Sequence, residues 1–484
     1  MSLKTVRRAD RPSVRQAICA VGVLWAAAAL VKAQRSILPD LVAYPNPSGH
    51  HRTHSVNGPI DETNPFFRSL GTNGRACVTC HDPADGWTVT PAHLRDRFTA
   101  TGGLDPIFRT NDGSNSPHAD VSTVRARRAA YSMLLSKGLI RVGIGVPANA
   151  EFELVDVDDP YGFASAAELS LFRRPLPSTN LTFLSAVMWD GRETFAGQSM
   201  HFDLADQANA ATLGHAQAAH PLTDAQREAI VEFEAGLFTA QSDDDNAGDL
   251  RGQGARGGPI PLSTEPFFIG INDVLGEDFT PRVFTIFDAW RNLERPAPPR
   301  GPLGPTPYVG IRDHGPDADA RDARYVEARR AIARGQEIFN TRPIAIRDVN
   351  GLNDVLGVSE IRGTCTTCHD APNAGDHSVG LPLDIGVTSA ARRTPDLPLY
   401  TFRNKTTGEI VRTTDPGRAL ITGKWRHMSL FKGPILRALA ARAPYFHNGS
   451  AATLDDVVDF YDTRFELHLS RQEKADLVAF LKAL

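Results

Sequence analysis

The chain has 484 residues, which is too long for one ordinary hydrophobic core and suits roughly two or three domains. Charged residues make up 22% of it and the formal net charge is −4, so it lacks the basic excess that nucleic-acid binding requires. The 34 prolines and 40 glycines predict that much of the chain runs as ordered loops.

Residues 1–33 have the pattern of an export signal. A basic start precedes an apolar run from Ala17 to Val31, and the short residues Val31-Lys32-Ala33 follow at a cleavage site. The run is shorter than the ~20 residues that a membrane-spanning helix needs. We therefore expect a cleaved signal and a periplasmic protein with no stable membrane span, and an uncleaved anchor is the alternative.

The cysteines carry the main chemical signal. Cys19 lies in the predicted signal, and the other four form Cys77-Val78-Thr79-Cys80-His81 and Cys365-Thr366-Thr367-Cys368-His369. In C-x-x-C-H, two thiols attach to one porphyrin and the next residue places an imidazole on the iron. The motifs predict two covalent haem c groups with His81 and His369 as proximal ligands. A single zinc site with four thiolates is the rival, but it leaves the repeated histidine unexplained.

The two motifs predict two domains after the signal. The first is expected over residues 34–293, a Pro- and Gly-rich linker over 294–322, and the second domain over 323–484. Both are expected to be cytochrome c-like haem domains. The predicted fold class is therefore mainly α, with long ordered loops and insertions.

Several regular elements are predicted along the chain. Residues 150–158 alternate between apolar and polar and indicate a strand, whereas residues 223–240 have a helical pattern with Thr223 as N-cap. In the second domain, residues 325–339 predict a helix before the haem motif. Residues 470–484 predict a closing helix, because Ser470 and Glu473 form a capping box.

Three further segments resemble the dihaem cytochrome c peroxidase/MauG family. They are Met188-Trp189-Asp190-Gly191-Arg192 with Asp206-Gln207-Ala208, then Gly433-Pro434-Ile435-Leu436-Arg437 with Ala443-Pro444-Tyr445-Phe446-His447-Asn448-Gly449, and Thr453 to Tyr461 with Leu477 to Leu481. The order and spacing match best in the C-terminal domain. Residues 93–172 and 240–322 have the character of insertions.

The resemblance implies a division of labour between the haems. The amino-terminal haem reacts with peroxide or oxygen, and the carboxy-terminal haem relays electrons from a donor such as a small cytochrome c or a cupredoxin. Trp189 matches the tryptophan that carries charge between the haems, the alternative being a buried aromatic without a redox role. Arg192 and Arg437 are candidate partners of haem propionates, with ordinary salt bridges as the alternative. A calcium ion between the domains is a further candidate cofactor.

The sequence departs from the family near the reactive haem. Family peroxidases place a glutamate shortly after Gln-Ala for acid–base work, but residues 209–217 contain no carboxylate. His215 or Gln217 has to take that role. No distal histidine precedes Arg173-Arg174-Pro175, so we expect the first haem to be open at its sixth position.

The sixth ligand of the second haem separates the branches of the family, because the peroxidases use a methionine there and the MauG branch a tyrosine. Tyr461 is the expected ligand, since it shares a helical face with Leu454 and Val458. Met428 is the rival. The predicted function is a peroxidase-like or MauG-like oxidoreductase, and a non-catalytic electron-transfer cytochrome or a dihaem oxygenase are the alternatives.

Overall fold

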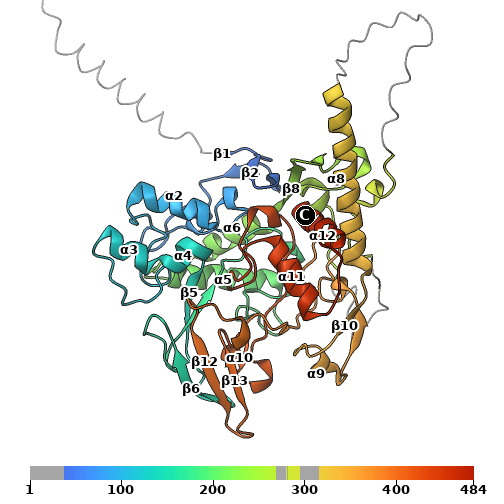
Figure 1. Cartoon of the computed structure of the whole chain (residues 1–484). Helices are drawn as coiled ribbons and strands as arrows, with labels where there is room; N and C mark the ends of the chain where they lie inside the picture. The colour runs from blue at the N-terminus through green and yellow to red at the C-terminus, as the bar shows by residue number, and fades with distance from the viewer. Residues whose placement is uncertain (1–36, 269–279, 281, 295–315) are drawn as a thin grey trace, which may run out of the picture.

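A computed structural model describes residues 37–268, 280, 282–294 and 316–484 of the chain (Figure 1). The predicted signal, residues 1–33, lies outside these residues, and so does most of the predicted linker. Within the described residues, no helix combines the length and apolarity needed to span a membrane.

The described residues form a mixed α/β structure, so the expected mainly α class is wrong. The helices are α2 Pro91–Thr101, α3 Val124–Ala130, α4 Ser132–Lys137, α5 Met200–Gly214, α6 Asp224–Ala235, α7 Pro259–Leu262, α8 Pro316–Thr341, α9 Asn353–Leu356, α10 Ala419–Thr422, α11 Leu454–Arg464 and α12 Arg471–Lys482. The strands are β1 Ile37–Leu38, β2 Tyr44–Asn46, β3 Gly49–Ser55, β4 Ile60–Asp61, β5 Ile140–Ile144, β6 Phe152–Asp158, β7 Leu169–Arg173, β8 Leu237–Asp244, β9 Gly248–Asp249, β10 Ile344–Ile346, β11 Ile361–Gly363, β12 Leu399–Asn404 and β13 Ile410–Thr413.

The strands pair across long sequence distances, which explains the error in fold class. The predicted strand at 150–158 is confirmed as β6, and it pairs antiparallel with β12 in the sheet β13-β12-β6, which projects at the lower end of Figure 1. A second sheet has the order β2-β3-β8-β9. Such pairing partners lie up to 252 residues apart (Phe152 and Asn404), so local sequence pattern does not reveal them.

The predicted helix over residues 223–240 is confirmed in its first part. Thr223 caps α6, and its side chain accepts from the backbone N–H of Gln226 in a capping box. The helix ends at Ala235, and β8 begins at Leu237 because that segment pairs with β3. Tertiary pairing thus overrides the helical periodicity of the last residues.

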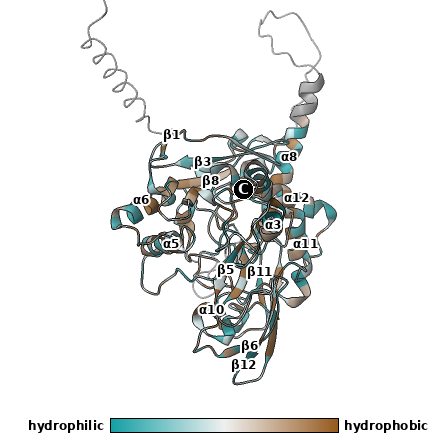
Figure 2. Cartoon of the chain, turned by 90° about the vertical axis from the view of Figure 1, so that its left-hand side faces the viewer, coloured by the Kyte–Doolittle hydropathy of each residue, from teal (hydrophilic) through white to brown (hydrophobic). Residues whose placement is uncertain are grey.

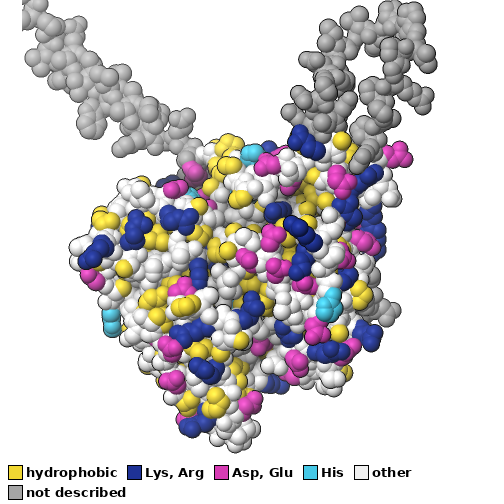
Figure 3. Space-filling model, viewed as in Figure 1, with side chains coloured by type: hydrophobic (Ala, Val, Ile, Leu, Met, Phe, Trp, Pro, Cys, Tyr) yellow, Lys and Arg dark blue, Asp and Glu magenta, His cyan; other side chains and the backbone are white. Residues whose placement is uncertain are grey.

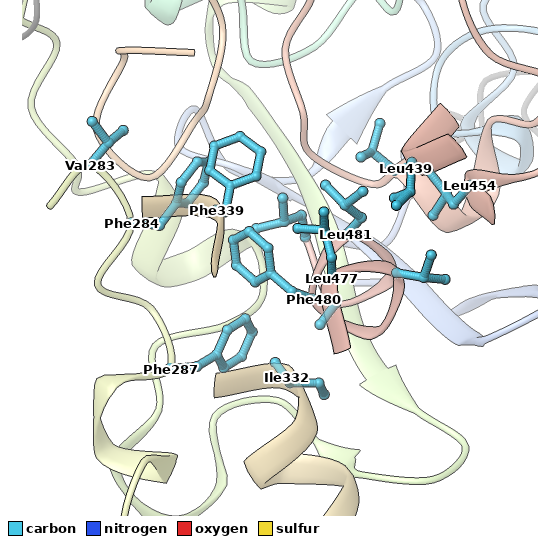
Figure 4. Packing of buried hydrophobic residues seen from close by; sticks show 14 of the residues in the cluster. Val283, Phe284, Phe287, Ile332, Phe339, Leu439, Leu454, Leu477, Phe480 and Leu481 are labelled. Carbon is cyan, nitrogen blue, oxygen red and sulfur yellow. The ribbon is translucent and has the colours of Figure 1, made fainter. Parts of the chain in front are cut away.

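Helices α8 and α12 form the centre of the C-terminal half. The predicted helix at 325–339 lies within α8, and Ser470 caps α12 with the expected capping box. Gly335 allows the two helices to touch, since a Cβ there would lie 2.0 Å from the carbonyl oxygen of Asp476. Aromatic side chains fill the space beside this contact (Figure 4), where Phe284 packs edge to face against both Phe339 and Phe480.

The outer surface has the mixed character of an ordinary globular protein. Figure 2 shows polar and apolar residues interspersed along most helices. On the face shown in Figure 3, Lys and Arg alternate with Asp and Glu in small groups. That face carries no continuous basic surface.

Candidate functional site

The first C-x-x-C-H motif forms a tight turn that points its histidine into a cavity. Cys77–Thr79 is one turn of 3₁₀-helix, and the backbone N–H of His81 donates to the carbonyl of Cys77 at 3.0 Å. Nδ1 of His81 donates to the carbonyl of Trp87 at 3.0 Å. Burial lowers the pKa of His81 to about 4. The imidazole is therefore neutral, with Nε2 left to bind a metal.

The second motif repeats this geometry. Cys365–Thr367 forms the same turn, and Nδ1 of His369 donates to the carbonyl of Gly375 at 2.7 Å. Burial lowers the pKa of His369 to about 4 as well. None of the four motif cysteines forms a disulfide. The two motifs thus present the same donor set: a free cysteine pair and a neutral imidazole fixed by a backbone carbonyl.

A large cavity adjoins each motif. Cavity 1, beside His81, has a free volume of about 970 Å³, and an adjoining space of about 790 Å³ reaches Cys77 and Cys80. Cavity 2 contains Cys365, Cys368 and His369 in its wall and has a free volume of about 1520 Å³. These volumes include open space at the mouths of the cavities, and the histidine of each motif lies in the wall of its cavity. The residues present therefore fit a covalently attached haem at each motif.

Trp189 and Lys432 line both cavities and form part of the wall between them. The indole N–H of Trp189 donates to the carbonyl of Arg174 at 2.8 Å, and the backbone N–H of Lys432 donates to the carbonyl of Trp189 at 2.9 Å. His447 lies edge-on to Trp189, with ring centroids 6.0 Å apart, and stacks on Phe431. Trp189 therefore lies in the wall that the two cavities share.

A buried ion network holds this wall in place. Arg173, the last residue of β7, donates to Asp190 at 2.5 Å and to both oxygens of Asp415 at 2.7 and 2.9 Å. All three side chains are buried. Asp190 also accepts from Arg192, which lines cavity 1. The Trp-Asp-Gly-Arg string is therefore anchored by charge-assisted hydrogen bonds.

His215 and Gln217 occupy different environments. His215, just after α5, lines cavity 1 together with His81, and its Nδ1 lies 2.5 Å from Oδ2 of Asp112. Gln217 is exposed, has a positive φ of 53°, and accepts a hydrogen bond from Asn73 at 3.3 Å. Of the two candidates for acid–base work, the structure brings His215 to the cavity and leaves Gln217 outside its lining.

Two side chains of cavity 1 were missed by the sequence analysis. Gln207 of α5 and Glu234 of α6 line it. Glu234 is buried, and desolvation raises its pKa to about 8. The sequence pattern could have identified Glu234, because it falls four residues after Ile230 on the apolar face of the predicted helix. A carboxyl group on an apolar helical face is unusual and points to a cavity.

The two candidate propionate partners differ in position. Arg192 lines cavity 1, whereas Arg437 is buried and donates to the carbonyls of Asn373 at 2.8 Å and Gly258 at 3.4 Å. Burial lowers the pKa of Arg437 to about 10. Arg437 is not among the residues that line cavity 2.

The two candidate ligands of the second haem are also separated. Tyr461 of α11 lines cavity 2, and its ring centroid lies 6.4 Å from that of His369. Burial raises the pKa of its phenol. Met428 is buried elsewhere, in a cluster with Phe152 and Tyr400. The structure brings Tyr461, and not Met428, to the second motif.

The predicted calcium ion has no obvious ligand set. Within the described residues, no group of three or more His, Cys, Asp or Glu side chains is arranged to hold a metal ion. Calcium therefore stays a prediction without an assigned site.

A fixed, neutral histidine beside a cysteine pair in a cavity wall is the donor set that covalent haem c attachment uses. No family model matches the chain. The cytochrome-c peroxidase IdrP2 of Denitromonas iodatirespirans is 37% identical to it over 133 residues, which are 25% of this chain and 36% of that protein. IdrP1 of Pseudomonas sp. (strain SCT), also a cytochrome-c peroxidase, is 31% identical over 192 residues, which are 33% of this chain and 50% of that protein.

Further comparisons agree with these. The cytochrome c551 peroxidase of Nitrosomonas europaea is 31% identical over 144 residues, 28% of this chain and 36% of that protein. The chain thus spans between 36% and 50% of the length of these curated relatives. A solved MauG-like protein associated with microbial copper homeostasis matches 92% of this chain and 94% of its own at 15% identity, but its TM-score of 0.35 is too low to support a conclusion. The peroxidase similarities confirm the resemblance to the dihaem cytochrome c peroxidase/MauG family at modest identity.

Proposed function

We propose that the chain is an exported, periplasmic dihaem oxidoreductase of the cytochrome c peroxidase/MauG type. Peroxide or oxygen reacts in cavity 1, and electrons from a small cytochrome c or a cupredoxin reach it through cavity 2. The observation that carries the proposal is the asymmetry of the cavities: His215 shares cavity 1 with His81, while Tyr461 and mostly apolar side chains surround His369.

Each haem, attached through Cys77 and Cys80 or through Cys365 and Cys368, would supply an iron that exchanges electrons and, in cavity 1, binds the oxidant. Reduction of peroxide consumes two electrons and two protons and releases two water molecules. The protein must therefore move protons at the oxidant. His215 suits this task, because a histidine whose Nδ1–H is donated to a carboxylate keeps a basic Nε2.

The wall between the cavities serves charge transfer. Trp189 belongs to both cavities, and its indole N–H donates to a backbone carbonyl, which is too weak a base to take the proton. Trp189 can thus pass charge without losing its proton. Arg192 is retained as a partner for a haem carboxylate in cavity 1, and Tyr461 as the ligand of the second iron.

The direct test mixes the reduced holoprotein with hydrogen peroxide and follows both haem spectra in a stopped-flow instrument. Reduced cytochrome c or cupredoxin is then added as donor. We expect one peroxide consumed for every two donor molecules oxidised. Two low-spin haems without carbon monoxide binding indicate the electron-transfer cytochrome instead. Oxygen uptake without peroxide turnover indicates the dihaem oxygenase.

A further inference from the structure

The side chain of His215 is held by a buried ion pair that the family resemblance does not supply. Asp112, in the loop between α2 and α3, is 5% exposed. Its Oδ2 lies 2.5 Å from Nδ1 of His215, and its Oδ1 accepts from Nη1 of Arg75 at 2.5 Å. The same Nη1 donates to the backbone carbonyl of His215 at 3.1 Å. Each of the three residues therefore contacts the other two.

Arg75 ties this set to the haem attachment site. It stands two residues before Cys77, and its guanidinium also donates to the carbonyls of Pro106 at 2.9 Å and Ile107 at 2.6 Å. Nearby, the backbone N–H of Thr72 donates to the carbonyl of Ala216 at 3.0 Å. A Cβ on Gly71 would lie 1.8 Å from that carbonyl oxygen, so the approach requires glycine. The chain that leads into the first motif is thus packed against the end of α5.

We propose that Asp112 is a positioning residue that fixes the tautomer and direction of His215 toward the oxidant in cavity 1. An ionised carboxylate only accepts hydrogen bonds, so Nδ1 must carry the proton and Nε2 is left as the base. This proposal rests on the proposed acid–base role of His215. It explains how the site works without the glutamate that family peroxidases use.

The charges around the dyad agree with this role. Burial alone raises the pKa of Asp112, but the hydrogen bond from His215 and the charge of Arg75 lower it below its usual value. Asp112 and Arg75 contact His215, and Arg68, His81 and Glu234 lie in the same cavity wall. Asp112 therefore stays ionised beside one fixed cation, and its second oxygen is free for His215.

Two probes of the first haem separate positioning from simple structural support. Hydrogen cyanide must give up a proton when it binds ferric haem as cyanide, whereas carbon monoxide binds ferrous haem without any proton. In Asp112→Asn, the amide can donate to Nδ1 and select the wrong tautomer. We expect its cyanide association rate to fall at least about tenfold, because general base catalysis contributes about 100-fold or more. Its carbon monoxide association rate should stay within about twofold of the wild type.

Matched variants complete the test. Asp112→Glu keeps the charge and should recover part of the cyanide rate, and the exposed Asp96→Asn on α2 should behave as wild type. Haem content and the spectrum of the second haem report on folding. If Asp112→Asn loses haem, Asp112→Ser takes its place, and wild-type cyanide kinetics or equal slowing of both probes in that variant overturns the proposal.

The failures of the two proposals are distinguishable. A wild-type protein whose first haem binds neither probe contradicts the proposed function itself. Unchanged cyanide binding in His215→Ala removes the acid–base role of His215. Slow binding in His215→Ala together with unchanged binding in Asp112→Asn, or equal slowing of both probes in Asp112→Asn, overturns only the role of Asp112.

Discussion

Cavity 1 and cavity 2 begin from the same local geometry and differ in most of the side chains around it. In each, a C-x-x-C-H turn holds a buried histidine whose Nδ1 donates to a backbone carbonyl. Cavity 1 then adds His215 and Glu234, which can move protons, and the hydrogen-bonding amide of Gln207. Cavity 2 is walled mainly by aliphatic and aromatic side chains and adds Tyr461. The motif therefore predicts the cofactor, while its neighbours determine what the cofactor does.

The largest expected effect is the loss of one haem at a time. Replacing Cys77 and Cys80 by alanine should leave one haem per chain and abolish carbon monoxide binding, because the remaining haem lies in cavity 2. Replacing Cys365 and Cys368 should also leave one haem but keep carbon monoxide binding. Pyridine haemochrome assays and carbon monoxide difference spectra measure both. The opposite pattern of gas binding would reverse the proposed roles of the cavities.

Removal of the proposed base, His215, should slow the reaction in cavity 1 and leave cavity 2 unchanged. We expect His215→Ala to slow the reaction with peroxide by about 100-fold, the usual contribution of an acid–base group. Gln217→Ala is the matched control, since its side chain lies outside the cavity lining, and it should keep its rate within about twofold. Stopped-flow spectra give both rates. Equal rates in the two variants would leave cavity 1 without its proposed base.

The ligand of the second iron is the corresponding test of cavity 2. Tyr461→Phe should change the spectrum of the second haem, because it removes the phenol oxygen from the cavity wall. Met428→Leu should leave that spectrum unchanged, since Met428 packs in a separate cluster. Absorption and magnetic circular dichroism spectra separate the cases. A thioether–iron charge-transfer band that disappears in Met428→Leu would assign the ligand to Met428.

Communication between the cavities should depend on their shared wall. Trp189→Phe keeps an aromatic ring in the wall but makes it harder to oxidise, so electron transfer between the haems should slow. Trp425→Phe is a suitable control, because Trp425 packs beside the cluster of Phe152 and Phe402. The measurement is the rate at which the second haem is oxidised after peroxide is added. If the second haem is oxidised at the same rate in the two variants, Trp189 has a packing role and no role in electron transfer.

The last expected effect concerns stability and pH and leaves the reaction in cavity 1 aside. The folded state raises the pKa of Glu234 from 4.5 to about 8, so the folded state holds a proton that the unfolded chain releases between these values. The raised pKa of Glu234 makes its full contribution to the free energy of unfolding below about pH 4.5. As the pH rises toward 8, this contribution falls by up to about 1.4 kcal/mol per pH unit. Glu234→Gln should flatten the pH dependence of the free energy of unfolding.

Guanidinium denaturation at about pH 5 and about pH 7.5 measures this slope. Glu232→Gln on the exposed side of α6 is the control and should keep the wild-type slope. If Glu234→Gln keeps the wild-type pH dependence of the free energy of unfolding, the carboxyl group of Glu234 is ionised in the wild-type holoprotein.

The sequence by itself determined the features that depend on local covalent chemistry and local hydrogen bonds. Haem attachment needs two thiols and a histidine within five residues, so the pattern suffices to predict it. The N-caps at Thr223 and Ser470 were predictable for the same reason, because each bond spans three residues. The resemblance to the peroxidases likewise came from short strings such as Trp189-Asp190-Gly191-Arg192.

Only the tertiary structure decided which side chains share a cavity. The sheet that joins β6 to β12 and the contact between Asp112 and His215 connect residues far apart in the chain, and no local period records such pairs. The same holds for Glu234, which the helical pattern placed on an apolar face without showing what that face meets. Burial and charge compensation act on these long-range neighbours, which is why the mainly α expectation was wrong and why His215 and Gln217 could not be told apart before their surroundings were known.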